Sequence, residues 1–278
     1  MWVRLPALGT IHFNNLFVSF DELKVAVELE GGCLVTGVRD GEPTINGTLS
    51  VWPQIGRANG ASAISLRTME FAPGLSLGFR NQECDEIIYV LQGTATILID
   101  ASSYLVQPET GVYLRPGAIL TVDNPGPEPF VLISSQCPEP VATSETLPPL
   151  TSRQSPEASP LRRSPIARLA DREAVPTADR WYRVLVDDEA GSTQVTQFVG
   201  SIPPGRAPDH FHNYEEVLFI LRGVGRMWAG KTQTPIASGS CIYLPKGQVH
   251  CVENTGDDEL RLLGIFYPAG SPSVRYEV

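Results

Sequence analysis

Histidine is scarce in this chain, with four in 278 residues, and several common signals are missing altogether. There is no dense run of lysine and arginine, and the net charge is -10, which argues against a nucleic-acid backbone or an anionic membrane surface as a partner. No apolar run approaches the length that spans a bilayer, and the first ten residues lack the apolar core and cleavage site of a secretion signal. These absences leave a small molecule as the expected partner and the cytoplasm as the expected location.

Paired cysteines are also lacking. The five cysteines are odd in number and irregularly spaced, and no C-x-x-C pair occurs. This pattern signals neither a disulfide framework nor a structural zinc site, so we expect mostly small buried thiols.

Long helical periodicity is absent as well, and short apolar runs take its place. Turn signals interrupt these runs every ~8–12 residues. Pairs such as Asp40-Gly41 and Asn46-Gly47 supply the positive φ that tight hairpins need. Regular short strands without helices predict an all-β protein built as a sandwich or barrel.

The composition changes between Pro138 and Pro165, where proline, serine and threonine dominate and apolar runs vanish. Such a segment cannot bury enough apolar surface to offset its ordering entropy, which predicts an exposed linker. We therefore expect an N-terminal barrel domain over residues 1–138, a linker over 139–170 and a C-terminal barrel domain over 171–278.

The strand pattern after the linker repeats the first half at a displacement of 130 residues. The matches are residues 86–93 on 216–223, Tyr113-Leu114 on Tyr243-Leu244, Gly117 on Gly247, and Asn124 on Asn254. Several matches at one displacement indicate an internal duplication. The chain is predicted to be two copies of one β domain.

Three of the four histidines, His210, His212 and His250, gather near Glu216 in the second copy. His210 and His212 are two residues apart, so on a strand both point to one face, and Glu216 shares their parity. A turn before His250 can bring that side chain across the barrel. Since histidine is the commonest transition-metal ligand, the cluster predicts a metal site.

The spacing around these residues resembles the two motifs of the cupin superfamily. The pattern is Gly205, four residues, His210-x-His212, three residues, Glu216, six residues, Gly223; then Gly239, five residues, Pro245-x-Gly247, two residues, His250, three residues, Asn254. It departs from the family only in having four residues, not five, between Gly205 and His210. The first half resembles the same motifs after decay, so the chain is similar to a bicupin over about residues 60–138 and 180–268.

This resemblance implies two tandem antiparallel β-barrels of the double-stranded β-helix or jelly-roll type. It implies that His210, His212, Glu216 and His250 bind one divalent transition metal, which can be Fe, Mn, Ni, Co or Zn. About two coordination positions would stay open for water, dioxygen or a chelating substrate.

The first copy lacks this ligand set. At the same displacement, Arg80, Gln82, Glu86 and Leu120 occupy the four ligand positions. Leucine cannot bind a metal and arginine would repel one, so we expect a metal-free N-terminal barrel. Two readings of Arg80 stay open, an ion pair with Glu86 and an anion site.

Weaker candidates lie on the predicted strands of the second copy. Gln197, Arg226, Trp228 and Tyr243 would line the pocket if they point inward, and each is equally a core or rim residue. Arg226 is the candidate for binding an anionic substrate. Glu215 is expected to be solvated, with a role as the true carboxylate ligand as the alternative.

The open site implies a metal-dependent enzyme acting on a small polar organic molecule that chelates the metal in the C-terminal barrel. Family frequency, and no residue here, favours a dioxygenase. A non-redox isomerase, decarboxylase or cyclase is the alternative, and a non-catalytic small-molecule-binding protein is the rival from another class. Fold alone does not choose among them.

The first 50 residues lie outside the resemblance. They are expected to add strands to one sheet or to cross to a neighbouring domain or subunit. Open sheet edges of this kind favour a homodimer.

Overall fold

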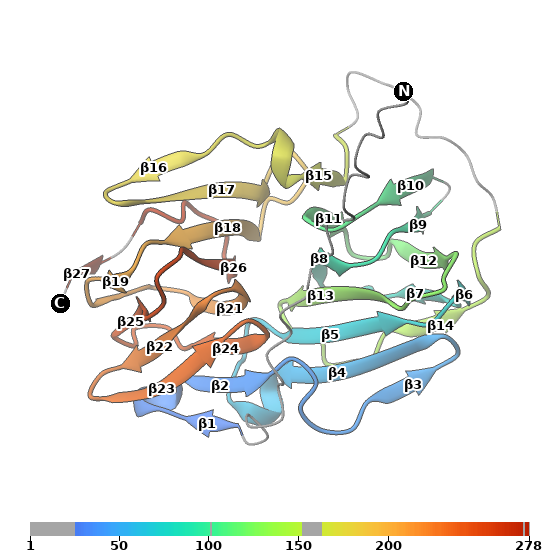
Figure 1. Ribbon diagram of the computed structural model, residues 1–278. Coiled ribbons are helices and arrows are strands. Elements are labelled where there is room, and N and C mark those ends of the chain that lie inside the picture. Colours follow the sequence, from blue (N-terminus) through green and yellow to red (C-terminus); the bar gives the residue numbers. More distant parts are fainter. Residues whose placement is uncertain (1–25, 101, 152–162, 275, 278) are drawn as a thin grey trace, which may run out of the picture.

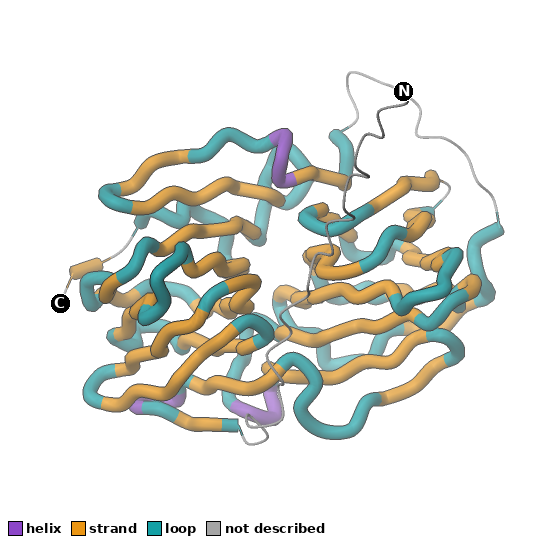
Figure 2. The backbone as a smooth tube through the Cα atoms, in the orientation of Figure 1, coloured by secondary structure: helices purple, strands orange, loops and turns teal. Residues whose placement is uncertain are grey.

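Two β-barrels lie side by side in the computed structural model (Figure 1). The structure describes residues 26–100, 102–151, 163–274 and 276–277, so the strands expected before residue 26 lie outside the described residues. Helical structure in these ranges is limited to three short 3-10 turns, namely η1 (Glu30–Gly32), η2 (Arg57–Asn59) and η3 (Leu169–Asp171) (Figure 2). The all-β fold of two antiparallel barrels is confirmed.

The C-terminal barrel consists of an eight-stranded and a six-stranded sheet. The eight-stranded sheet runs in the order β1 (Val27–Glu28), β2 (Leu34–Gly37), β24 (Ser240–Leu244), β21 (Glu215–Arg222), β26 (Leu260–Tyr267), β18 (Thr196–Ile202), β17 (Arg180–Val186) and β16 (Val175–Thr177). The six-stranded sheet contains β23 (Thr232–Ala237), β22 (Val224–Ala229), β25 (His250–Asn254), β20 (His210–Phe211) and β27 (Tyr276–Glu277), with β19 (Gly205–Arg206) paired to β25.

The N-terminal barrel repeats this plan with a seven-stranded and a six-stranded sheet. The seven-stranded sheet runs in the order β15 (Ile166–Arg168), β11 (Thr110–Leu114), β8 (Asp85–Gln92), β13 (Phe130–Cys137), β5 (Leu66–Phe71), β4 (Leu49–Ile55) and β3 (Thr44–Asn46). The six-stranded sheet contains β10 (Ser102–Val106), β9 (Ala95–Ile99), β12 (Ile119–Asn124), β7 (Gly78–Arg80) and β14 (Glu145–Leu147), with β6 (Gly74–Leu75) paired to β12.

Each barrel receives strands from outside its own part of the chain. β2 pairs antiparallel with β24 of the C-terminal barrel, although residues 1–138 were assigned from the sequence to the N-terminal domain. β14 and β15 fall in the expected linker, yet they pair with β7 and β11 of the N-terminal barrel. β24 and β11 would otherwise leave unpaired backbone groups at sheet edges, and these added strands satisfy them.

The two copies share a hydrogen bond from an asparagine side chain to a backbone carbonyl, as the duplication predicts. Nδ2 of Asn124 donates to the carbonyl of Glu128 at 3.0 Å, and Nδ2 of Asn254 donates to the carbonyl of Asp258 at 2.8 Å. Each asparagine therefore closes the turn that follows its strand.

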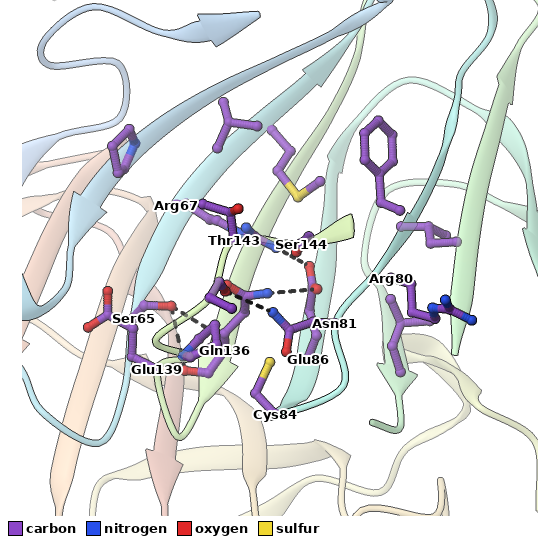
Figure 3. A pocket seen from close by; sticks show the side chains of 18 of the residues that line it. Ser65, Arg67, Arg80, Asn81, Cys84, Glu86, Gln136, Glu139, Thr143 and Ser144 are labelled. Carbon is purple, nitrogen blue, oxygen red and sulfur yellow. Dashed lines mark hydrogen bonds and ion pairs between the residues drawn. The ribbon is translucent and has the colours of Figure 1, made fainter. Parts of the chain in front are cut away.

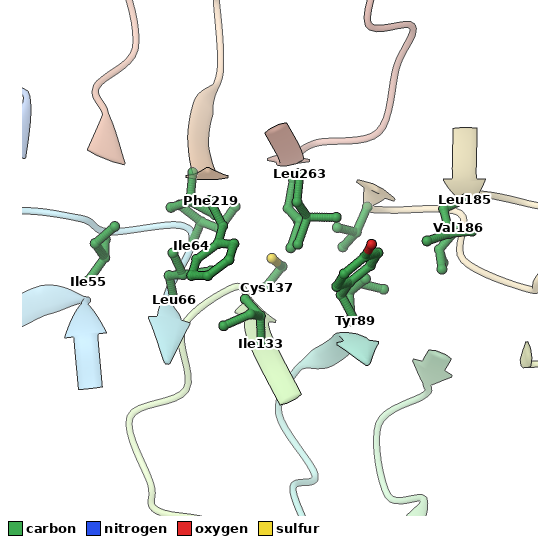
Figure 4. Close-up of a cluster of buried hydrophobic side chains, with 14 of the residues drawn as sticks. Ile55, Ile64, Leu66, Tyr89, Ile133, Cys137, Leu185, Val186, Phe219 and Leu263 are labelled. Atoms are coloured by element: carbon green, nitrogen blue, oxygen red, sulfur yellow. The ribbon is translucent and has the colours of Figure 1, made fainter. Parts of the chain in front are cut away.

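Side chains of the two large sheets alternate between a barrel interior and the interface between the barrels. On β21, Leu218 and Ile220 pack inside the C-terminal barrel, whereas Val217 and Phe219 belong to the interface cluster. Figure 4 shows this cluster, in which Phe219 and residues of both barrels meet. The period of two fixes which residues can reach each cavity.

Two further expectations concern buried thiols and membrane spans. All five cysteines are free and buried, as expected from their spacing. Among the described residues, no helix has the length and apolarity to cross a membrane.

Candidate metal centre

Two short strands of the six-stranded sheet position the histidines of the C-terminal barrel, with His212 directly after the end of β20. His210 begins β20 and His250 begins β25, and the two residues are direct partners in the antiparallel register. Potential ligand atoms of His210, His212 and His250 all lie within 4.8 Å of one another. The structure thus brings together the three histidines that the spacing predicted.

Backbone carbonyls orient two of these rings. Nδ1 of His210 lies 2.9 Å from the carbonyl oxygen of Pro208, and Nδ1 of His250 lies 2.8 Å from that of Gln248. A carbonyl oxygen only accepts, so each Nδ1 carries the proton and leaves Nε2 as a lone-pair donor. Metal-binding histidines are held in this way.

Glu216 approaches His212 from the facing sheet. It shares the inward parity of Leu218 on β21, and its Oε2 lies 3.5 Å from Nε2 of His212. Burial raises the pKa of Glu216 to about 8. Burial, with a smaller contribution from the charge of His210, lowers the pKa of His212 to about 4 and that of His250 to about 3.

These properties fit a divalent cation. Desolvation opposes a proton charge on His212 and His250 and opposes the carboxylate charge on Glu216, so these three residues are favoured in their neutral forms. Nδ1 of His212 is also buried without a hydrogen-bond partner in the described structure. A bound dication would compensate the carboxylate, and three imidazoles with one carboxylate suit the metals named above.

The ring of His212 is held by an aromatic stack that the sequence did not reveal. Tyr214 stacks on His212 at 4.8 Å between ring centroids with 10° between the planes, and on Phe266 at 4.6 Å and 19°. Tyr214 also lines the cavity beside the three histidines. Its place two residues after His212 is the signal that could have identified it.

We expect Tyr214→Ala to weaken metal binding by about 10-fold, because the stack fixes the ring of His212 and orienting partners of ligands matter at this scale. Tyr214→Phe keeps the stacking surface and should bind the metal as the unaltered protein does. Competition with a chromophoric chelator measures both affinities. Equal affinities for Tyr214→Ala and Tyr214→Phe would show that the stack does not position the ligand.

A cavity of about 130 Å³ adjoins His210, His212, Glu216 and His250. Its apolar lining includes Phe198, Leu218, Val252 and Leu262. Arg180 on β17 is the one arginine in this lining, and its Nε donates to Asp179 at 2.9 Å. The volume admits only a molecule of a few heavy atoms beside a metal.

The C-terminal segment closes the sheet next to the site. β27 pairs with β20, so that Tyr276 lies opposite Phe211 and their rings stack at 5.4 Å. Pro272 and Ser273, which precede β27, reach the cavity lining.

None of the four expected pocket residues lines this cavity. Gln197 and Tyr243 follow the outward parity of β18 and β24, so they face the other barrel. Gln197 is fully buried there, and the Tyr243 hydroxyl donates to the carbonyl of Gly60 at 3.4 Å.

Arg226 and Trp228 lie on the outer face of β22, because Met227 and Ala229 take the inward positions. Nε1 of Trp228 donates to Glu253 at 2.8 Å, and Arg226 lies 3.9 Å from the same carboxylate. Arg226 therefore faces away from the cavity, and the expectation that it binds an anionic substrate there is wrong.

Glu215 is half-buried and points away from the histidines. Its carboxylate accepts hydrogen bonds from the Ser62 hydroxyl at 2.7 Å and from the Ala63 backbone N–H at 2.8 Å. The outward parity at Glu215 directs it to a loop of the N-terminal barrel. It connects the barrels next to the site.

The structure shifts the ligand-equivalent positions of the N-terminal barrel by one residue. Leu120 pairs with Phe79, as His250 pairs with His210, so Phe79 takes the place assigned to Arg80. Gly117 N–H donates to the carbonyl of Asn81 at 2.7 Å, as Gly247 N–H donates to that of His212 at 2.8 Å. Asn81 therefore takes the place assigned to Gln82.

The reason is one extra residue in the loop before β8. Asn81 precedes Glu86 by five positions, whereas His212 precedes Glu216 by four. A constant displacement cannot register this insertion. The equivalents of the ligand set are Phe79, Asn81, Glu86 and Leu120, and Phe79 and Leu120 have no metal-binding atom.

The expected pair of Arg80 with Glu86 does not form. Arg80 Nη2 lies 2.6 Å from Glu145 on β14, and Figure 3 shows its guanidinium directed away from Glu86. Glu86 instead pairs with Arg67 on β5, at 2.7 Å from Nη2 to Oε1. The sequence carried no signal for Arg67, because β5 is remote from the duplicated motif.

Comparison with known proteins agrees with this site. The model of the cupin domain matches residues 198–266. Auxin-binding protein 1 of Arabidopsis thaliana is 32% identical over 85 residues, which is 27% of this chain and 43% of that protein. An uncharacterised protein of Aquifex aeolicus is 32% identical over 87 residues, 30% of this chain and 70% of that protein. The oxalate-binding protein of Thermotoga maritima is 33% identical over 66 residues, 23% of this chain and 54% of that protein.

Solved structures extend the likeness to both barrels. Oxalate decarboxylase from Bacillus subtilis at pH 4.6 matches with a TM-score of 0.67 and 16% identity, covering 84% of this chain and 76% of that chain. A deletion mutant of the same decarboxylase matches with a TM-score of 0.69 and 15% identity, at 84% and 76% coverage. At 15–16% sequence identity, this likeness shows that the fold is shared and shows nothing about activity.

Proposed function

Because the chain belongs to the cupin superfamily, as a bicupin whose metal motif is intact only in the C-terminal barrel, we propose that this barrel is a metal-dependent enzyme site for a small carboxylate. One observation carries the proposal. Three histidines and a buried carboxylate converge at the wall of a cavity of about 130 Å³ that also contains an arginine.

The bound metal would supply Lewis-acid or redox chemistry at the open coordination positions. His210, His212, Glu216 and His250 would hold it. The apolar part of the lining would lower the polarity around the reacting group, which strengthens electrostatic interactions there. Arg180 offers its guanidinium to a carboxylate oxygen of the substrate.

The size of the cavity and the names of similar proteins suggest which substrates to try first. Oxalate and small 2-oxo acids are short enough for the cavity and chelate a metal through two oxygens. A structural neighbour is named for decarboxylating oxalate and a sequence relative for binding it. Decarboxylation without net oxidation is therefore the reaction to test first, and the dioxygenase suggested by family frequency is the second.

The test uses the full chain, purified anaerobically and reconstituted separately with Fe(II), Mn(II), Ni(II), Co(II) and Zn(II). Carbon dioxide release and oxygen uptake are measured with oxalate, pyruvate and a phenolic acid. We expect carbon dioxide from a carboxylate with at least one metal, and no turnover from His212→Ala. Oxygen uptake that matches product formation would favour the dioxygenase.

A non-catalytic binding role is the second candidate, since two relatives are named for binding. Besides the four expected ligands, the titratable side chains in the cavity lining are Arg180, Tyr182 and Tyr214, so few groups there could act as a general acid. Retention of oxalate by the metal-loaded protein without turnover would favour this role. Less than about half an equivalent of metal after reconstitution would contradict both candidates.

Arg180→Gln should weaken the binding of an anionic substrate by about 10-fold or more, because a charge-assisted hydrogen bond is lost. The effect should fall on KM or Kd and leave kcat nearly unchanged, as for an interaction equal in ground and transition states. Arg226→Gln is the matched control, because Arg226 lies outside the cavity. A loss with Arg226→Gln and none with Arg180→Gln would reverse the assignment.

A further inference from the structure

A cavity of about 380 Å³, larger than the one beside the histidines, lies in the barrel that lacks the metal ligands. Figure 3 shows its polar end, where Arg67, Gln136 and Glu86 converge. Small-molecule sites commonly have volumes of about 300–1,000 Å³ with a few polar groups on an apolar lining. The N-terminal barrel thus has an open cavity of this size, although it lacks the metal ligands.

Protein groups take over the role of a cation at Glu86. Its Oε1 accepts from Arg67 Nη2 at 2.7 Å and from the Ser134 hydroxyl at 2.6 Å, and its Oε2 accepts from Gln136 Nε2 at 3.3 Å. The carboxylate charge is thus compensated within the protein, with both oxygens engaged.

The C-terminal barrel has apolar residues at the corresponding places. Arg67 lies opposite Ser134 on the neighbouring strand, and the equivalent pair in the C-terminal barrel is Phe198 and Gly264. Gln136 lies opposite Glu86, and the equivalent pair is Phe266 and Glu216. The three donors occur only in the barrel without the metal ligands. Together, these three donors bind both carboxylate oxygens of Glu86.

This arrangement fixes the guanidinium of Arg67 and leaves part of it open. Nε donates to Ser134 at 3.1 Å and Nη2 to Glu86, while Nη1 has no hydrogen-bond partner among the described residues. The Arg67 side chain is 18% exposed and lines the cavity. Its open donors suit a planar oxyanion, because a guanidinium matches carboxylate geometry.

The other charges around the cavity are balanced by neighbours. Arg80 pairs with Glu145 at 2.6 Å and Arg115 with Asp100 at 2.9 Å, while Glu139 accepts from the backbone N–H of Arg57 and lies 3.9 Å from its guanidinium. Arg67 is also paired, with Glu86, but it is the most buried of these arginines, since its side chain is 18% exposed against 30% for Arg80 and 62% for Arg115.

Apolar side chains make up a large part of the remaining lining, beside several neutral polar ones. Met69, Phe79, Leu114 and Leu120 form much of it. Burial raises the pKa of the Cys84 thiol to about 12, so it stays protonated and is no nucleophile near neutral pH. The lining thus suits the apolar body of a ligand and offers no covalent chemistry.

We propose that the N-terminal barrel is a metal-independent binding site for a small monocarboxylate with an apolar body, whose carboxylate is bound by Arg67. Phe79 and Leu120, which replace two histidine ligands, contact the body of this ligand. The site is independent of the metal centre and of the function proposed for it.

The experiment uses the full chain treated with a chelator, in both the unaltered and the His212→Ala forms, so that the metal centre cannot contribute. Benzoate, hexanoate and 3-phenylpropanoate are titrated by calorimetry alongside their uncharged amides. We expect at least one acid to bind with one equivalent per chain in both forms. Its amide should bind about 10-fold or more weakly, because the charge-assisted contact is lost.

Two variants locate the site. Arg67→Lys keeps the charge beside Glu86 but loses the planar donor edge, and Leu120→Phe reduces the cavity without touching Arg67. Each should weaken the acid by about 10-fold or more, with circular dichroism confirming the fold. The proposal is overturned if no acid binds the chelated protein, if acid and amide bind equally, or if both folded variants bind as the unaltered chain does.

Discussion

Replacing His212 by alanine should abolish metal binding and leave the protein folded. The imidazole is one of three that converge within 4.8 Å, and Glu216 reaches it at 3.5 Å. Loss of a ligand should cost more than the about 10–100-fold in affinity that loss of an orienting partner costs. Metal content after reconstitution, measured by elemental analysis, should fall from about one equivalent to a small fraction.

The fold should survive because this ring contributes little to protein hydrogen bonding. Its Nδ1 is buried without a partner in the described part of the chain, so truncation removes an unsatisfied polar atom together with some packing on Tyr214. Circular dichroism and the thermal transition should stay close to those of the unaltered metal-free protein.

The duplicate barrel supplies the matched control. Asn81 occupies the position equivalent to His212, so Asn81→Ala makes the corresponding truncation in the N-terminal barrel. This variant should keep full metal content. Full metal content in His212→Ala as well would mean that the ligands are wrongly assigned.

The second large effect is expected from breaking the pair of Arg67 and Glu86. Arg67→Met leaves a carboxylate that is 11% exposed with two neutral donors and no cation. Removing one partner of a buried pair costs about 3–5 kcal/mol, and partial exposure of Arg67 lowers our expectation to about 2–4 kcal/mol. Urea unfolding of the full chain measures this loss.

The charge explanation requires recovery in a double variant. Arg67→Met with Glu86→Leu removes both charges and should regain most of the lost stability, because an apolar pair has no desolvation penalty. A double variant as unstable as Arg67→Met would assign the loss to packing.

The two barrels place one ancestral glutamate in opposite surroundings. Glu216 has apolar neighbours, Phe198 and Phe266, so that only a bound cation would compensate its carboxylate charge, whereas Glu86 has three protein donors. The internal comparison explains how the N-terminal barrel keeps its acidic residue without the metal ligands.

Local sequence patterns were sufficient for several features. Short runs with a period of two determine strands, and the repeat near Glu86 and Glu216 determines a pair of barrels. The spacing of His210 and His212 places both on one side of a strand, since side-chain direction alternates along the backbone. These features depend on residues that are close in sequence, or on the duplication, so the chain itself discloses them.

The tertiary structure decided what depends on contacts between distant strands. The ion pair of Glu86 with Arg67, 19 positions apart, and the contact of Glu215 with Ser62 exist only after the sheets have formed. The extra residue before Glu86 shifts the equivalence of Asn81 without leaving a mark in local pattern. Inward or outward parity at Arg226 required knowledge of which face meets the cavity, because alternation alone separates two faces and does not say which one is buried.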